Sequence, residues 1–161
     1  MRWLEIKIIE ADNYNFPSIV KLYEDKEFFF KSKRPESLFE GNIKELVLNN
    51  SDKAFLIYCN NKLEGLVSIE EDEIEKNSIF INLRLKDMNL ILDNGESFNN
   101  LLFDISREYG IIKMRIFDFD EIGKKVCKEL QFNIEAILKD HIYKNNKYNN
   151  LLIYSKKVDR W

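Results

Sequence analysis

Alternation of apolar and polar residues predicts strands along much of the chain. Residues 4–10 place Leu4, Ile6 and Ile8 opposite Glu5 and Lys7, which is the period of a half-buried strand. Related patterns occur at 53–60, 63–71, 78–87, 111–120, 134–143 and 151–157. The run at 53–60 is apolar without alternation, which is typical of a strand covered on both faces, so it is expected at the centre of a sheet.

Apolar residues three and four apart predict helices at 17–30, 36–50, 96–110 and 121–132. The helix at 96–110 has the clearest apolar face, and Gly110 is its predicted C-terminal stop. Asn61 and Lys62 are expected to form a hairpin turn, and the polar residues 144–150 join the last two strands. The order of elements predicts an α+β fold with a mixed, mostly antiparallel sheet of about seven strands, about four flanking helices and one parallel crossover.

Size and charge limit the classes of function. The 161 residues suit a single domain, 1–161, and the 25 basic and 28 acidic residues are intermixed with a formal charge of −3. Without a field of one sign, neither nucleic acid nor an anionic membrane is an expected partner. Cys59 and Cys127 are the only cysteines and lack the spacing of a zinc site, so no metal site and a reducing cytoplasm are expected. The N-terminal apolar stretch is interrupted by charges, unlike a signal sequence or membrane span.

The stretch KKVCKELQFNIEAILKDHIYKNNKYNNLLIYS, residues 124–155, resembles the closing helix and hairpin of the GNAT superfamily of N-acetyltransferases. That family ends roughly with A-x-x-L-Y-E-K-L-G-F, E-G-x-L-R-D and Y-K-N-G-K-Y-x-D. The matching residues are Leu130, Phe132, Glu135, Leu138, Asp140, Tyr143, Lys144, Asn145, Lys147 and Tyr148. The resemblance implies transfer of an acetyl group from acetyl-CoA, as co-substrate, to a primary amine of an amino sugar nucleotide, a peptide or a small molecule. It also implies a possible homodimer.

The family holds the CoA diphosphate with Q/R-x-x-G-x-G/A at a helix start, where this chain reads LILDNGESFNN. The Asn-Gly pair resembles the amino-sugar-nucleotide branch. The resemblance implies CoA contacts from Leu83, Leu85, Asn94, Gly95, Glu96, Ser97, Phe98 and Asp120. Asp93 and Glu96 place carboxylates beside the expected phosphates, and Phe98 stands where a small residue is usual. A second interpretation therefore stays open: a non-catalytic binding or regulatory module of the same fold.

Several residues are candidates for chemistry, each with a structural alternative. Cys127 is in register with the family's tyrosine that protonates the departing CoA sulfur, or it is a small residue of the core. Glu70 and Glu71 end a strand near the expected position of the family's cleft, so either is a candidate to deprotonate the acceptor amine, directly or through water, or they form the solvated end of a strand. The candidate acceptor-binding residues are Phe29, Lys31, Arg34, His141 and Tyr143. For this set the alternatives are an aromatic core segment and a structural histidine.

Overall fold

The computed structural model describes residues 4–12, 15–24 and 53–158. Helix α1 (Phe16–Glu24) begins at the predicted first helix, and the rest of that prediction lies outside the described residues. The predicted helix at 36–50 also lies outside them, as do Phe29, Lys31 and Arg34. None of the described helices is long and apolar enough to span a membrane.

The strands form one sheet in the order β1-β2-β3-β4-β5-β7-β6. Their bounds are β1 Ile6–Glu10, β2 Ala54–Cys59, β3 Lys62–Glu71, β4 Ser78–Leu85, β5 Ile111–Phe117, β6 Asn133–Lys144 and β7 Lys147–Lys157. Strands β4 and β5 are parallel, and β1–β2, β2–β3, β5–β7 and β6–β7 are antiparallel. With the four described helices, this confirms the predicted fold class.

Strand β2 was expected at the centre of the sheet, and this expectation is wrong. It pairs with β1 and β3 and lies second from the β1 edge, whereas β4 has the middle position. Its apolar run is explained locally, because Ala54 and Leu56 pack with Phe16, Ile19 and Leu22 of α1 in one buried cluster. A covering helix therefore buries a strand near an edge as well as one at the centre.

Two Asn-Asn pairs make the tight turns of the described hairpins. Asn60 and Asn61 have φ of 50° and 64°, and Asn145 and Asn146 have φ of 55° and 60°. Asparagine tolerates this left-handed region, and two consecutive residues there suit a two-residue hairpin loop. The first turn thus lies one residue earlier than predicted. The predicted 144–150 connection shrinks to two residues, because β6 and β7 extend into it.

The chain divides into two compact units, of which the first combines residues 1–70 and 82–87. Its buried cluster joins α1 to β2 and to Leu66 of β3. Gly65 of β3 lies so close to the backbone of Arg84 and Leu85 that any side chain would collide with it. Glycine is therefore required where these two segments meet.

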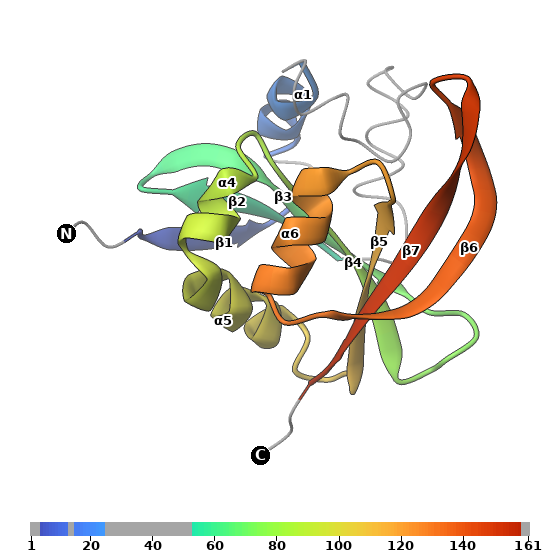
Figure 1. Ribbon diagram of the computed structural model, residues 1–161. Helices are drawn as coiled ribbons and strands as arrows, with labels where there is room; N and C mark the ends of the chain where they lie inside the picture. Colours follow the sequence, from blue (N-terminus) through green and yellow to red (C-terminus); the bar gives the residue numbers. More distant parts are fainter. Residues whose placement is uncertain (1–3, 13–14, 25–52, 159–161) are drawn as a thin grey trace. The chain divides into compact units, whose positions relative to one another are not determined.

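The second unit combines residues 71–81 with residues 88–161. It contains the helices α4 (Asn89–Asp93), α5 (Gly95–Ile105) and α6 (Glu121–Glu129) and the long β6–β7 hairpin drawn in orange and red in Figure 1. The predicted helix 96–110 is shorter, because Ser106 ends it and donates its hydroxyl to the Leu102 carbonyl. Gly110 instead donates its N–H to the Asn77 carbonyl, 2.9 Å away. The single-domain organisation stays a prediction.

Candidate functional site

Strands β4 and β5 are paired over a short distance only. The parallel register joins Ser78 to Ile111, Ile79 to Ile112 and Phe80 to Lys113, and no further pair links these two strands in the described residues. Ile81 and Met114 follow the last pair, and Met114 is paired on its other side with Tyr154 of β7. Backbone N–H and C=O groups require partners. The end of pairing therefore offers strand edges to which an extended, amide-containing ligand can bind.

The predicted phosphate loop is not an open loop. Its first half forms the short helix α4, in which Ile91 is completely buried. Asn94 stands between α4 and α5 and donates its side-chain amide to the Leu90 carbonyl, 2.9 Å away. Phe98 is also completely buried, so it belongs to the core instead of facing a cofactor. These contacts make the segment a packed helical turn in place of an open glycine-rich loop.

Carboxylates surround the start of α5, and we call Asp93, Glu96 and Glu129 around Gly95 the acidic α5 start. A Cβ atom at Gly95 would lie 2.7 Å from Oε1 of Glu129, so the Glu129 carboxylate lies against the backbone here. Glu96 lies in the first turn of α5, and Asp93 is the last residue of α4. Like charges repel, and the residues present therefore do not fit a diphosphate.

Three other residues predicted to contact the cofactor are buried or cap a helix. Leu83 and Leu85 are buried in β4 of the first unit. Asp120 precedes α6 and accepts the N–H of Gly123 at 2.9 Å, which is the geometry of an N-terminal cap. This cap explains why an acidic residue stands between β5 and α6.

Cys127 lies on the buried face of α6 and has no exposed surface. Burial, with a smaller effect of the Asp120 carboxylate, raises the pKa of its thiol to about 12. The thiol therefore stays protonated at neutral pH, but nothing exposes it to a ligand. Its position favours the packing role that the sequence also allowed.

The other candidate residues lie on strands. Glu70 is half-buried at the end of β3 in the first unit. His141 is exposed on β6, where pairing with β7 is irregular between Leu138 and Ile142. Tyr143 is also exposed and packs edge-on against Tyr148, with ring centroids 5.1 Å apart.

Asp118 is not among the candidates from the sequence, and it lies within the predicted strand 111–120. It follows the last residue of β5, and its Oδ2 accepts the backbone N–H of Asn150 at 3.0 Å. Oδ1 is buried and has no hydrogen-bond partner among the described residues. An unpaired buried carboxylate oxygen is costly, and such groups occur at functional sites. The signal in the sequence was its place at the carboxyl end of a strand, directly before a helix.

Asp118 stands between two aromatic residues, and the Lys124 ammonium interacts electrostatically with its carboxylate. Phe117 and Phe119 stack with their centroids 5.3 Å apart, and the Lys144 ammonium lies 4.3 Å from the centroid of Phe119. Within the described residues, no group of three His, Cys, Asp or Glu side chains could hold a metal ion.

Comparison with known proteins places the fold. No protein-family model and no curated protein matches the sequence. Among solved structures, a ribosomal L7/L12 alpha-N-protein acetyltransferase in complex with coenzyme A aligns with a TM-score of 0.78 and 17% identity, covering 96% of this chain and 94% of that chain. An N-acetyltransferase from Staphylococcus aureus aligns with a TM-score of 0.74 and 13% identity, covering 96% and 99%.

A spermidine/spermine N-acetyltransferase from Vibrio cholerae is also similar, with a TM-score of 0.67 and 16% identity over 94% of this chain and 92% of that chain. At these identities the likeness shows the fold. It extends over nearly the whole chain in each case, and not only over the C-terminal hairpin that carried the sequence resemblance.

Proposed function

We propose that this chain, which has the fold of the GNAT N-acetyltransferases, transfers an acetyl group from the thioester of acetyl-CoA to an amine. The observation that carries the proposal is the end of β4–β5 pairing after Phe80 and Lys113. Ile81 and Met114 then present backbone groups that the amide-containing arm of a thioester donor can pair with. The fold likeness, including a neighbour in complex with coenzyme A, supports the same donor.

The chemistry needs few protein groups. The neutral amine attacks the thioester carbon, the C–N bond forms and the C–S bond breaks. A backbone N–H at the end of strand pairing stabilises the negative charge on the carbonyl oxygen. The amine loses one proton, and the departing thiolate gains one. No step uses the diphosphate, because the acidic α5 start does not fit it.

Asp118 is our candidate for holding the acceptor amine. Its Oδ1 lacks a partner among the described residues, and an ammonium or amine N–H would supply the missing donor. A carboxylate selects a cationic acceptor, such as the amine of a peptide or of a small molecule. An amino sugar nucleotide has a suitable amine but an anionic diphosphate, so it fits this carboxylate less well. The cytoplasm and a homodimer remain predictions.

The test is incubation of the protein with acetyl-CoA and, in turn, a peptide with a free N-terminus, spermidine and a UDP-linked amino sugar. Release of free thiol and the mass of the acetylated product are measured together. We expect product with at least one amine, and about 10²-fold less with Asp118→Asn at unchanged donor binding. Full activity of Asp118→Asn would remove the role of Asp118, and no product with any amine would contradict acetyl transfer to these acceptor classes.

A second candidate function is a binding or regulatory module without catalysis. Two observations favour it: the Glu129 carboxylate against Gly95 and the complete burial of Cys127. In this case the protein keeps the fold but does not bind acetyl-CoA. Absence of both donor binding and thiol release in the experiment above would support it.

A further inference from the structure

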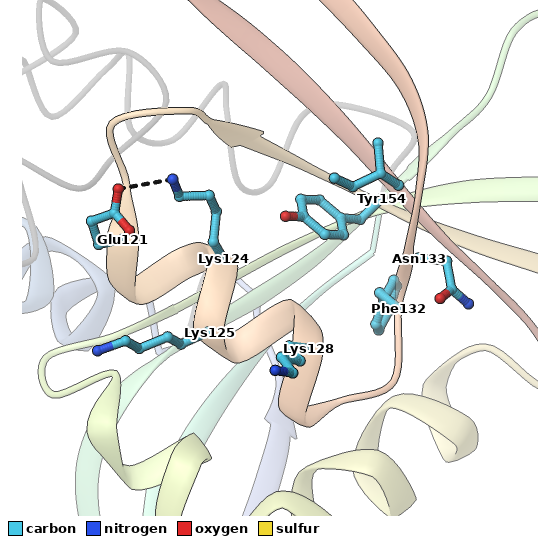
Figure 2. Close-up of a pocket in the computed structure, with 8 residues that line it drawn as sticks. Glu121, Lys124, Lys125, Lys128, Phe132, Asn133 and Tyr154 are labelled. Atoms are coloured by element: carbon cyan, nitrogen blue, oxygen red, sulfur yellow. Dashed lines mark hydrogen bonds and ion pairs between the residues drawn. The ribbon is translucent and has the colours of Figure 1, made fainter.

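The face of α6 that carries Lys124, Lys125 and Lys128 borders an open pocket with a cavity volume of about 490 Å³. Its lining residues come from α6, the following turn and the two last strands: Glu121, Lys124, Lys125, Lys128, Phe132, Asn133, Ile134 and Tyr154. Figure 2 shows Glu121 and the three lysines on α6, and Phe132, Asn133 and Tyr154 on the side of the β6–β7 hairpin. A cavity of this size suits a small-molecule ligand. The proposed acetyl transfer uses none of these residues.

The charges around the pocket favour an anion. Three lysines and one carboxylate line the pocket, and Lys124 pairs with Glu121 at 2.8 Å, as the dashed line in Figure 2 shows. Lys125 and Lys128 are exposed and have no ion pair or hydrogen bond in the described residues. Lysine ammonium groups bind phosphate as flexible point charges. The pocket therefore has uncompensated positive charge at its rim.

Tyr154 offers a hydrogen-bond donor to the pocket. The residue is 7% exposed, and its hydroxyl points from β7 toward α6 into the pocket. That hydroxyl makes no hydrogen bond with the described residues and is not among their fully buried unpaired atoms, so it is open to the pocket. Burial, with a smaller effect of Cys127, raises the pKa of Tyr154, so the hydroxyl remains a donor at neutral pH.

The inner wall is apolar. Phe132 is 5% exposed, and its ring lies near the end of α6 in Figure 2. Ile134 is 52% exposed although it is a large apolar residue. With the ring of Tyr154, these side chains offer a surface for a flat or aliphatic group. A ligand that fits both parts has an anionic end and an apolar body.

We propose that this pocket, which borders the proposed acetyl-transfer site through the pairing of Tyr154 with Met114, is a second binding site for a small molecule that carries a phosphate group on an apolar ring. Lys128, which has no ion pair in the described residues, holds the phosphate, Tyr154 donates a hydrogen bond to it, and Phe132 and Ile134 contact the ring. Asn133 supplies a further polar group at the rim.

The test uses phenyl phosphate, inorganic phosphate and phenol as probes, followed by NMR titration of the full chain. Phenyl phosphate should bind tightest, because it alone meets both parts of the pocket, and raising the salt concentration should weaken it. Tyr154→Phe and Lys128→Ala should each weaken phenyl phosphate by about tenfold. Lys76→Ala, which removes the same charge from an exposed turn, is the matched control and should leave binding unchanged.

Several outcomes would overturn the proposal. Equal affinity for phenyl phosphate in wild-type protein, Tyr154→Phe and Lys128→Ala would place the probe elsewhere. Equal weakening by Lys76→Ala would indicate attraction by overall charge. Competition between phenyl phosphate and acetyl-pantetheine, a thioester without phosphate, would show that the pocket is part of the transfer site. Simultaneous binding of the two supports separate sites.

Discussion

The second unit has two regions that could meet a phosphate, and their charges are opposite. The acidic α5 start combines a helix N-terminus with the carboxylates of Asp93, Glu96 and Glu129. The lysine face of α6 has three ammonium groups beside a pocket. The sequence resemblance predicts the phosphate at the first region. The difference teaches that a helix end in the expected place does not make an anion site when carboxylates and buried side chains occupy it.

The largest expected change in stability tests whether the side chain of Phe98, near the beginning of α5, belongs to the hydrophobic core. Phe98→Ala should lower the free energy of unfolding by about 3–5 kcal/mol, because it removes a completely buried ring. Phe103→Ala on the same helix is the control, since Phe103 is 38% exposed and should cost much less. Urea unfolding measures both. Equal, small costs would indicate that Phe98 does not belong to the core.

A second prediction concerns carboxylates that, unlike those of the acidic α5 start, form ion pairs with a lysine. Lys113 lies 3.2 Å from Asp72 and 2.6 Å from Glu75, and the side chains of Lys113 and Asp72 are each 9% exposed. Burial alone would raise the pKa of Asp72, but hydrogen bonds from two backbone N–H groups, Lys113 and Ser78 hold this pKa below its usual value of 3.8. Asp72→Asn should therefore cost about 2 kcal/mol at neutral pH.

The pH dependence follows from the same shift. A lowered folded-state pKa contributes stability that is complete above the unfolded pKa and is lost as the pH falls through the folded value. Thermal melts from pH 6 down to pH 2 should show a steeper loss for the wild-type protein than for Asp72→Asn. Parallel curves would contradict the assignment of this acid sensitivity to Asp72.

A third prediction removes a charge from the acidic α5 start. Glu129→Gln should strengthen acetyl-CoA binding by about tenfold, because a carboxylate no longer repels the phosphates near Gly95. It should not change binding of acetyl-pantetheine, which has no phosphate. Glu108→Gln, an exposed carboxylate beyond the end of α5, is the control for overall charge. Calorimetry with both ligands measures the effect, and equal changes in the two variants would contradict it.

The smallest expected effect concerns the buried face of α6. Cys127→Ala should cost about 1 kcal/mol of stability and leave the acetyl-transfer rate unchanged, because the thiol is packed in the core. Cys127→Tyr should be destabilising, because a larger ring strains a filled interior. Melting temperatures and single-turnover rates of both variants decide this. A rate about 10²-fold lower for Cys127→Ala in a stably folded protein would restore the general-acid role.

The sequence predicted the fold well because its signals were periodic. Alternation of apolar and polar residues predicted β1 and β3–β7, and helical spacing of apolar residues at 121–132 predicted α6. Both patterns arise because these elements bury one face and expose the other. Position along the sheet was not predictable from one strand, as β2 shows: a helix covers it near the edge. Turn positions shifted by a residue because Asn-Asn, and not Asn-Lys, accepts positive φ twice.

The candidate site was harder to predict because it depends on contacts distant in sequence. Nothing near Gly95 in the sequence indicates that Glu129 lies against it. The unpaired oxygen of Asp118 depends on Asn150, whose N–H occupies the other oxygen. The pocket beside Tyr154 requires α6 and β7 together. Local patterns report the face of an element, but they do not report which element lies opposite.

The most direct test of the account compares acetyl-CoA with acetyl-pantetheine by calorimetry on the wild-type protein. If the strand edges hold the thioester arm and the acidic α5 start rejects the diphosphate, both ligands should bind with dissociation constants near 100 μM, about −5.5 kcal/mol, and within about threefold of each other. Acetyl-CoA binding more than about 100-fold tighter than acetyl-pantetheine would contradict the account, because the diphosphate would then have a favourable site.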